Sequence, residues 1–442
     1  MNIYALSSGR GPSGIAIIRL SGDKAIEIAK IITKKTNLKS RQINFCKFFN
    51  PKNDKMIDEG ILLLFPAPNS FTGQNIAEFH IHGSNAVIKE FLNVLALQKN
   101  SRLADPGEFT KLAFQNNKVD LVEAESIGDL INAETEMQRQ QALKMIQGNA
   151  SQHYNNLREK LIKSLAHVEA KIDFGEEDIS QNVIQNAKKE ILEVYQEIKE
   201  ILEDQKVGEK IREGFKVSIV GQVNAGKSSL LNLLSKREAA IVSEEEGTTR
   251  DVIETYLDIG GYPVILSDTA GIREAKNEVE RKGISLAISK SINSDLNIVM
   301  IDNTTDKVEK KILDIINSNS IVVLNKSDIT NNKSTKYNEI GAILISVKQN
   351  KNIDNLIKAI KEKLNKKFIN NGNILVTRQR HRDKLKACLN EIEKFQRKNT
   401  SKEIELAAED LRMATRHLAS IIGRVDVEEI LGSIFKDFCI GK

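Results

Sequence analysis

The sequence predicts a multidomain protein with α/β, α+β and all-α parts, in which a doubly wound P-loop domain with a mostly parallel sheet is inserted into a helical domain. Three patterns carry this prediction. Strand-like apolar runs alternate with helical stretches from about Phe215 to about Leu364. On both sides of that region, apolar residues recur every three or four positions, which is typical of amphipathic helices. Short β-rich runs between glycine turns occupy the first part of the chain and predict an α+β domain.

In chain order, we expect an α+β domain at 1–118, helices at 119–210, the nucleotide domain at 211–368 and helices again at 369–442. No long Gly/Ser/Pro linker separates these parts. Each helical segment would expose an apolar stripe if it stood alone, so we infer that the two pack as one domain. Two separate helical domains are the alternative.

Composition sets limits on the class of protein. The 442 residues are 40% hydrophobic and 28% charged, as in soluble globular proteins, and they suffice for two to four domains. A net charge of +5 permits an RNA partner without arguing for one. Three scattered cysteines are too few for a disulfide framework or a zinc site. Because no apolar run reaches the roughly 20 residues of a membrane span and no signal peptide pattern is present, we expect a cytoplasmic protein without a membrane partner.

A phosphate-binding loop is the most informative motif. Residues 221–229 read Gly-Gln-Val-Asn-Ala-Gly-Lys-Ser-Ser and match GxxxxGK[ST] between an apolar strand and a leucine-rich helix. Backbone N–H groups and the helix dipole in such a turn point at phosphate oxygens. Lys227 is expected to reach the β- and γ-phosphates, and Ser228 to bind Mg²⁺. The expected nucleotide contacts in this loop are Gly221, Asn224, Ala225, Gly226, Lys227, Ser228 and Ser229.

Two further motifs specify GTP. The first consists of Asp268, Thr269, Ala270 and Gly271 and stands at the end of an apolar run. Its aspartate can hold Mg²⁺ through water, and its glycine can sense the γ-phosphate. Asn325, Lys326 and Asp328 follow a second apolar run. A carboxylate at Asp328 can accept the two N–H donors on one edge of guanine, which adenine does not offer, and Asn325 can read the acceptor side of the base.

At this point the sequence resembles the translation-factor-related GTPases. The resemblance makes residues 247–251 the switch segment, with Thr248 and Thr249 as nucleotide contacts, Thr249 as a Mg²⁺ ligand and Arg250 as a candidate catalytic residue. It makes Ser346, Val347 and Lys348 the last base-contacting loop. The middle residue of that loop is usually alanine, so Val347 departs from the pattern.

Hydrolysis needs a water held in line with the γ-phosphate and stabilisation of negative charge. Many small GTPases place a glutamine after the Asp-x-x-Gly motif, but this chain has Ile272, which cannot hydrogen-bond a water. Glu280 is a nearby carboxylate that can orient the water, and Asn224 can bind a monovalent cation that replaces an arginine finger. A solvated acid on a helix face is the alternative interpretation of Glu280.

The sequences around the nucleotide domain resemble the MnmE (TrmE) family of tRNA-uridine-modification GTPases over the full chain. The resemblance rests on Gly9 to Arg19, on Ser70-Phe71-Thr72-Gly73 with His82-Gly83, on Asp105 to Phe109 with the later Asn117 to Leu121, and on the C-terminal Phe-Cys-Ile-Gly-Lys. It implies a homodimer formed through N-terminal domains that bind 5-formyl- or 5,10-methylene-tetrahydrofolate. The matching folate positions are Arg19, Glu78, Lys118 and Lys442.

The same resemblance implies a flavoprotein partner, MnmG (GidA), which carries FAD, uses NADH and joins the dimer in a heterotetramer or larger complex. Together they would add an aminomethyl-type group to carbon 5 of the wobble uridine of tRNA, with the carbon from folate. The implied K⁺ ligands are Asn224, Ser243, Glu245 and Thr248, and the implied Mg²⁺ ligands are Ser228 and Thr249. Cys439 is either a reactive thiol near the folate or a small apolar residue of a terminal helix.

Two rival functions stay open. A regulatory or assembly GTPase that binds RNA or ribosomes would share the nucleotide motifs and lack folate binding. A dimeric scaffold with a vestigial GTPase is disfavoured because the phosphate and guanine motifs are intact.

Overall fold

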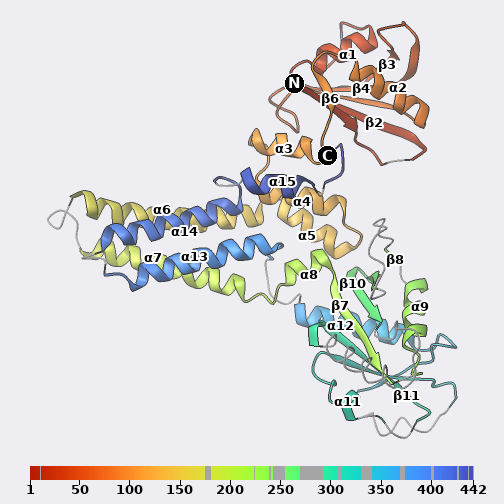
Figure 1. Cartoon of the computed structure of the whole chain (residues 1–442), viewed down its shortest axis with the longest axis vertical. Helices are drawn as coiled ribbons and strands as arrows, with labels where there is room; N and C mark the ends of the chain where they lie inside the picture. Colours follow the sequence, from red (N-terminus) through yellow and green to blue (C-terminus); the bar gives the residue numbers. More distant parts are fainter. Residues whose placement is uncertain are drawn as a thin grey trace. The chain divides into compact units, whose positions relative to one another are not determined.

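The computed structural model describes the chain except residues 10, 175–180, 223, 238–239, 242–253, 269–291, 306–307, 309, 330–340, 369–373, 400–402, 426–427, 437 and 442. The chain forms two compact units. The first contains residues 1–128, 151–158 and 416–442, and the second contains 129–150 and 159–415. Figure 1 labels the helices and strands. Within the described residues, no helix is long and apolar enough to cross a bilayer.

The first unit is built on a six-stranded sheet in the order β3-β4-β5-β2-β1-β6. Its strands are β1 Asn2–Leu6, β2 Ser13–Ser21, β3 Asn44–Phe49, β4 Met56–Phe65, β5 Ile76–Gly83 and β6 Ser101–Leu103. All neighbours are antiparallel except β1 and β6. The short β-rich runs predicted for the first part of the chain are confirmed by strands such as β2, β4 and β5.

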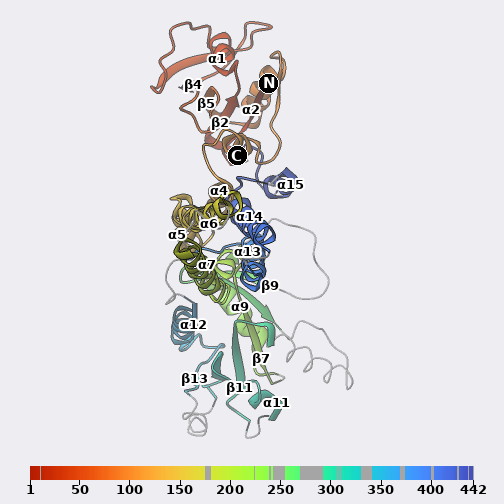
Figure 2. The same cartoon turned by 90° about the vertical axis from the view of Figure 1, so that its left-hand side faces the viewer.

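Helices α1 Ala25–Thr33 and α2 Asn85–Ala96 share a core with one face of this sheet (Figure 2). Alternate residues of β2, such as Ile18 and Leu20, point into this core because side chains alternate along a strand. The ring of Phe48 meets the ring of Phe91 edge to face at 5.5 Å between centroids. A second, smaller core around Ile3 and Phe109 covers the other face.

The end of the chain packs into the first unit. Helix α15 Glu428–Lys436 shares an apolar core with α3 Glu108–Gln115 and with the start of α4 Leu121–Ile131. Gly107 has φ +67°, and a Cβ there would lie 2.8 Å from the carbonyl oxygen of Phe435. A larger residue at this position is therefore excluded both by backbone conformation and by space.

The second unit contains a seven-stranded sheet in the order β13-β12-β11-β7-β10-β9-β8. The strands are β7 Phe215–Gly221, β8 Ala240–Ile241, β9 Glu254–Ile259, β10 Tyr262–Asp268, β11 Leu296–Asp302, β12 Ser320–Asn325 and β13 Ile343–Leu344. The five strands from β13 to β10 are parallel, and β9 and β8 are antiparallel additions. This arrangement is the predicted doubly wound, mostly parallel sheet.

Both faces of the central strands are buried, so their sequences are continuously apolar. Residues Val217 and Ile219 of β7 face a core shared with α9 Lys227–Arg237 and α12 Ile353–Phe368. Val220 faces the opposite side, where Ile312 of the short helix α11 Lys310–Leu313 packs.

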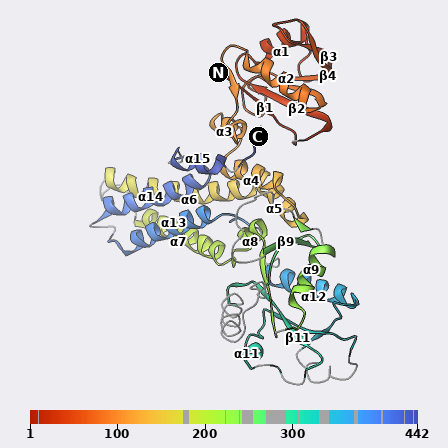
Figure 3. The ribbon, with the colours of Figure 1, turned by 45° about the vertical axis from the view of Figure 1, so that its right-hand side comes forward.

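Long helices precede and follow this sheet. They are α5 Glu136–Ile146, α6 Asn149–Phe174, α7 Gln181–Leu202, α8 Val207–Glu213, α13 Gln379–Arg397 and α14 Ile404–Ile421. Helices α7 and α13, far apart in sequence, lie side by side (Figure 3), and the Tyr195 hydroxyl donates to Glu393 at 3.0 Å. Arg412 of α14 reaches Glu169 of α6 at 3.0 Å between Nε and Oε1. Helices from both flanks of the nucleotide domain therefore pack together in the second unit.

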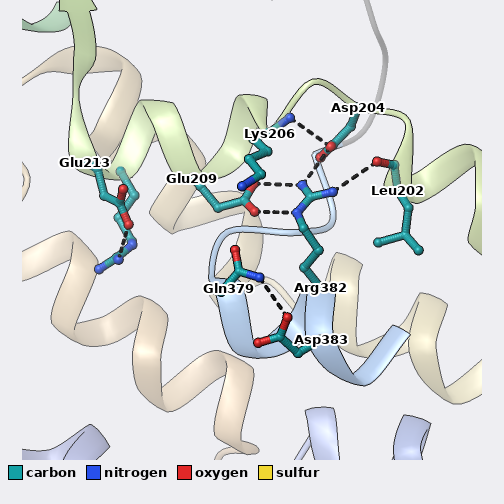
Figure 4. Close-up of polar contacts among 9 residues, drawn as sticks. Leu202, Asp204, Lys206, Glu209, Glu213, Gln379, Arg382 and Asp383 are labelled. Carbon is teal, nitrogen blue, oxygen red and sulfur yellow. Dashed lines mark hydrogen bonds and ion pairs between the residues drawn. The ribbon is translucent and has the colours of Figure 1, made fainter. Parts of the chain in front are cut away.

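A buried ion-pair cluster joins α8 to the start of α13 (Figure 4). The Arg382 guanidinium donates to both carboxylate oxygens of Glu209, at 2.7 and 2.9 Å, and to Asp204 at 2.7 Å. It also donates to the carbonyl oxygen of Leu202 at 3.0 Å. Because α8 leads into β7 and α13 follows the nucleotide domain, this cluster ties the entry and exit of that domain to each other.

Candidate functional sites

The phosphate-binding loop lies between β7 and α9. Gly221 ends the strand, and a Cβ there would lie 2.1 Å from the carbonyl oxygen of Met300, so the close approach of β11 requires glycine. Gly226 has φ +97°, and a Cβ there would lie 2.4 Å from the Asn325 side chain. These two positions keep the loop backbone open for the close approach of a phosphate.

The charged and polar groups of the loop lie at the start of α9 and just before it. Helix α9 begins at Lys227, whose ammonium group donates to the carbonyl oxygens of Gly221 at 3.1 Å and Gln222 at 2.8 Å. Ser228 and Ser229 are exposed in the first turn of that helix. Asn224 is exposed with φ +62°, a conformation that asparagine adopts more readily than most residues. Ala225 is buried.

Asn325 connects the phosphate loop to the base-reading loops. Its side-chain amide donates to the carbonyl oxygen of Ala225 at 2.8 Å, and its carbonyl oxygen accepts from the backbone N–H of Val347 at 3.1 Å. The contact with Val347 uses only its backbone, so a side chain larger than alanine is accommodated there.

Asp328 and Ser346 meet at the base end of the site. The Ser346 hydroxyl donates to Asp328 Oδ1 at 2.6 Å, and this hydrogen bond lowers the pKa of the Asp328 carboxyl. The carboxylate is therefore ionised and oriented as an acceptor at neutral pH. The neighbouring Lys326 pairs with Asp302 at 2.5 Å. Burial raises the pKa of Asp302, but hydrogen bonds from Lys326 and Thr304 outweigh it and the net shift is downward.

Asp268 is the last residue of β10 and pairs in register with Ile219 of β7, which places its backbone beside the strand that carries the phosphate loop. Several predicted residues lie outside the described part of the chain. They are Ser243, Glu245, Thr248, Thr249, Arg250, Thr269, Ala270, Gly271, Glu280 and Lys442.

A charged and aromatic cradle lies in the first unit. Arg19 of β2 pairs in register with Glu78 of β5, and their side chains form an ion pair at 2.8 Å between Nε and Oε1. The Arg19 guanidinium lies 5.7 Å from the ring centroid of Phe71 and 5.6 Å from that of Phe109. These distances are typical of cation–π contacts. Arg19 and Glu78, predicted as two separate folate contacts, are thus brought together as direct partners.

Lys118 and the C-terminal residues lie around the same loops. The Lys118 side chain approaches Gly73, where an added Cβ would lie 3.2 Å from Lys118 Cε. Cys439 is exposed and follows the end of α15, and its carbonyl oxygen accepts from the N–H of Gly107 at 3.4 Å. The C-terminal segment is thereby held at the loop that leads to Phe109.

Sequence reasoning did not assign a role to Phe71, Phe109, Gln222 or Asp302. The two phenylalanines stand in polar, glycine-containing segments, and an aromatic residue in such a segment is the signal that marks them. Nothing in the local sequence identifies Asp302, because its partner Lys326 follows another strand, β12.

The sheet order, the loop between β7 and α9 and the residues that follow β12 define a P-loop GTPase. Two family models match the chain: one described as "GTP-binding protein TrmE N-terminus" covers residues 2–118, and one described as "MnmE helical domain" covers residues 121–439. "tRNA modification GTPase MnmE" of Pelagibacter ubique (strain HTCC1062) is 55% identical over 443 residues and 100% of both chains. The protein of the same name from Rickettsia bellii (strain RML369-C) is 43% identical over 445 residues, 100% of this chain and 99% of that one. The chain therefore belongs to the MnmE family and is a GTP hydrolase.

Two solved structures each match 34% of the chain. Era in complex with MgGDPNP and a fragment of 16S ribosomal RNA is 28% identical with a TM-score of 0.27, over 34% of this chain and 56% of that one. The G domain of the T. maritima FeoB iron transporter is 21% identical with a TM-score of 0.26, over 34% of this chain and 98% of that one. Scores this low do not establish a shared fold.

Proposed function

We propose that this protein is a K⁺-dependent GTPase of the cytoplasm that acts on tRNA. With a flavoprotein partner it would install a (carboxymethyl)aminomethyl group at carbon 5 of the wobble uridine, with a one-carbon folate as donor. GTP hydrolysis would gate or drive the modification. The observation that carries this proposal is the full-length match, at 55% identity, to a relative named tRNA modification GTPase.

In the GTP site, Lys227 would exchange its bonds to Gly221 and Gln222 for bonds to phosphate oxygens. Asp328 would accept the guanine N–H donors, since Ser346 keeps its carboxylate ionised and oriented. Ser228 and Thr249 would hold Mg²⁺, which would supply positive charge to neutralise the phosphates. The proposed K⁺ ligands are Asn224, Ser243, Glu245 and Thr248, with Glu280 and Arg250 as the proposed catalytic side chains.

The cradle of the first unit fits a folate in its chemistry. Phe71 and Phe109 offer aromatic surface for a flat ring, and Glu78 offers a carboxylate for the N–H donors of a pterin. The cations Arg19, Lys118 and Lys442 suit the glutamate tail. Because Arg19 and Glu78 are each other's partners, a ligand with both N–H donors and a carboxylate would satisfy both groups.

The assembly is also proposed. Two copies would join through their N-terminal domains, and MnmG (GidA) would bring FAD and NADH in a heterotetramer or larger complex. Cys439 is exposed beyond the end of α15, which supports an accessible thiol better than a buried apolar role.

Mass spectrometry of wobble uridines tests the proposal. In cells that lack the protein, the carbon-5 modification should disappear, and the wild-type gene should restore it while Lys227→Ala and Arg19→Ala should not. An unchanged modification profile in the deletion strain would overturn the proposal. If tRNA is unchanged and no folate binding is detectable, an RNA- or ribosome-binding regulatory GTPase becomes the better reading.

A further inference from the structure

The start of α5 holds the tip of the β9–β10 hairpin. The backbone N–H of Met137 donates to the carbonyl oxygen of Gly261 at 3.0 Å. Gly260 and Gly261 form the turn with φ +60° and +94°, as a tight two-residue hairpin requires. The Met137 amide lies in the first helical turn, where it has no partner inside the helix, so the hairpin caps it.

This hairpin separates two segments assigned to the GTP site. Strand β9 begins at Glu254, shortly after Thr249 in the sequence, and β10 ends at Asp268. The last register pair joins Ser267 to Glu254, so both segments leave the hairpin from the same end. A contact at the tip therefore acts on both segments through two short, paired strands.

Helix α5 is also bonded to α8, which leads into the strand of the phosphate loop. The Gln138 side-chain amide donates to the carbonyl oxygen of Arg212 at 3.1 Å, and that of Gln141 donates to Gly208 at 3.0 Å. Gln138 has a second role, since its side-chain oxygen accepts from the N–H of Thr135 in a capping box. One helix thus contacts the hairpin on one side and the entry to β7 on the other.

The packing beneath α5 is loose compared with the ion pair that joins α8 to α13. A cavity of about 50 Å³ is lined by residues that include Met137, Met145, Ile211 and Ile374. Gln141 is 7% exposed and its Oε1 atom has no hydrogen-bond partner within the described part of the chain. By contrast, the bidentate Arg382–Glu209 pair holds the other side of α8. Space beside flexible methionines allows α5 to shift while the α8–α13 joint stays fixed.

We propose that α5 positions the GTPase machinery from outside the nucleotide sheet, and that Gln138 and the Met137 amide are the positioning groups. Together they tie the β9–β10 hairpin to α8, and thereby brace β10 and β7 against each other at the end of their ladder opposite Asp268. The inference rests on the proposed assignment of Asp268 and Thr249 to the GTP site.

Gln138→Glu separates the two roles of this side chain. A glutamate at the third helical position still accepts from the Thr135 N–H, and its charge favours a helix N-terminus, so α5 keeps its cap. It cannot donate to Arg212, so this hydrogen bond to α8 is lost, while the one from Gln141 to Gly208 remains. Gln152→Glu is the matched control, because Gln152 is exposed in the first turn of α6, away from the contacts of α5.

In the full-length protein, Gln138→Glu should lower kcat for GTP hydrolysis about tenfold. The Kd for GDP should change less than about twofold, because a misplaced catalytic group affects the transition state and not diphosphate binding. Gln152→Glu should match the wild type. In the wild type, hydrogen exchange in the first turns of α5 should differ between the GDP and GTP-analogue states, and Gln138→Glu should abolish that difference.

An unchanged kcat in Gln138→Glu would overturn the inference, as would a parallel loss of GDP affinity or an exchange pattern in α5 that is independent of nucleotide. Lys227→Ala distinguishes failure of the underlying site. If Lys227→Ala hydrolyses GTP normally, the GTP-site assignment is wrong. If it is inactive while Gln138→Glu is normal, only the positioning role is wrong.

Discussion

At the scale of single residues, Asn325 shows how a short motif organises the candidate GTP site. Its amide binds the phosphate loop at Ala225 and the last base-contacting loop at Val347, so one buried side chain joins three loops that are distant in sequence. A buried polar side chain with both ends satisfied fixes its neighbours, because leaving either group unpaired costs roughly 1–3 kcal/mol. Contacts within the protein therefore fix these loops relative to one another.

The proposed selectivity for guanine depends on Asp328. We expect Asp328→Asn to weaken GTP binding by more than about tenfold, because an amide replaces one acceptor oxygen with a donor that faces the guanine N–H groups. The residual affinity should favour xanthosine triphosphate, whose ring carries a carbonyl in place of the exocyclic amine. Competition binding with both nucleotides measures this, with Asp314→Asn, an exposed aspartate, as the control. Unaltered GTP selectivity would show that Asp328 does not contact the base.

Asn224 carries the proposed cation dependence. Hydrolysis by the wild type should be faster in K⁺ than in Na⁺, and Asn224→Ala should remove most of that difference. The side-chain oxygen is exposed in the loop and is a suitable ligand for a weakly hydrated cation. Steady-state rates at constant ionic strength, with each cation in turn, check this. Equal rates in both salts for the wild type would contradict the proposed site.

The His82–Asp58 pair gives a pH-dependent contact at the surface. Hydrogen bonding and attraction to the Asp58 carboxylate, 2.8 Å from Nδ1, raise the pKa of His82 above its ordinary value of 6.5. Since the folded pKa is raised, the contribution of this pair is fully present below about pH 6.5 and is lost as pH rises through the folded pKa. Titration of the His82 ring signals by NMR should show the upward shift, and Asp58→Asn should remove it.

At this scale the sequence predicted the phosphate and guanine motifs because their residues are close together and their spacing is fixed by local backbone geometry. The contact between Arg19 and Glu78 could not be read from spacing, since it joins residues 59 positions apart on neighbouring strands. Their importance was expected only from the resemblance to the MnmE family. The aromatic rings beside Arg19 were not predicted, because a phenylalanine in a turn can have many ordinary structural roles.

At the scale of elements, α8 connects the long helices to the nucleotide domain. Arg382 is 3% exposed and Glu209 is 6% exposed, so their ion pair is buried. Amphipathic periodicity predicted α7 and α13 correctly. It could not predict the cluster at their ends, because Arg382 and Glu209 are 173 positions apart.

Arg382→Met should loosen this joint. Removing one partner of a buried ion pair leaves an uncompensated charge and costs about 3–5 kcal/mol, whereas removing both can be nearly neutral. We therefore expect Arg382→Met to lower the apparent unfolding midpoint and to speed hydrogen exchange in α8 and α13. The double variant Arg382→Met with Glu209→Met should recover much of the loss. A single variant as stable as the wild type would show that the cluster is not important for this joint.

At the scale of the whole molecule, the two compact units each carry one candidate site. The Arg19–Glu78 cradle lies within the first unit and the phosphate loop within the second. The predicted fold class is confirmed, whereas the boundaries at residues 118, 210 and 368 stay predictions. Patterning gives the class of each segment but not how helices from distant segments share one core.

Separate cores predict that the two ligands bind independently at equilibrium unless the complete assembly couples them. Arg19→Ala should abolish binding of 5-formyl-tetrahydrofolate and leave the GDP affinity unchanged, because its contacts lie within the first unit. Lys227→Ala should weaken GTP binding and leave the folate affinity unchanged. Calorimetric titration of each variant with each ligand measures all four combinations. If either substitution changes the affinity for the other ligand more than about threefold, the sites are coupled by about 0.7 kcal/mol or more in the isolated protein, and communication between them does not require the flavoprotein partner or tRNA.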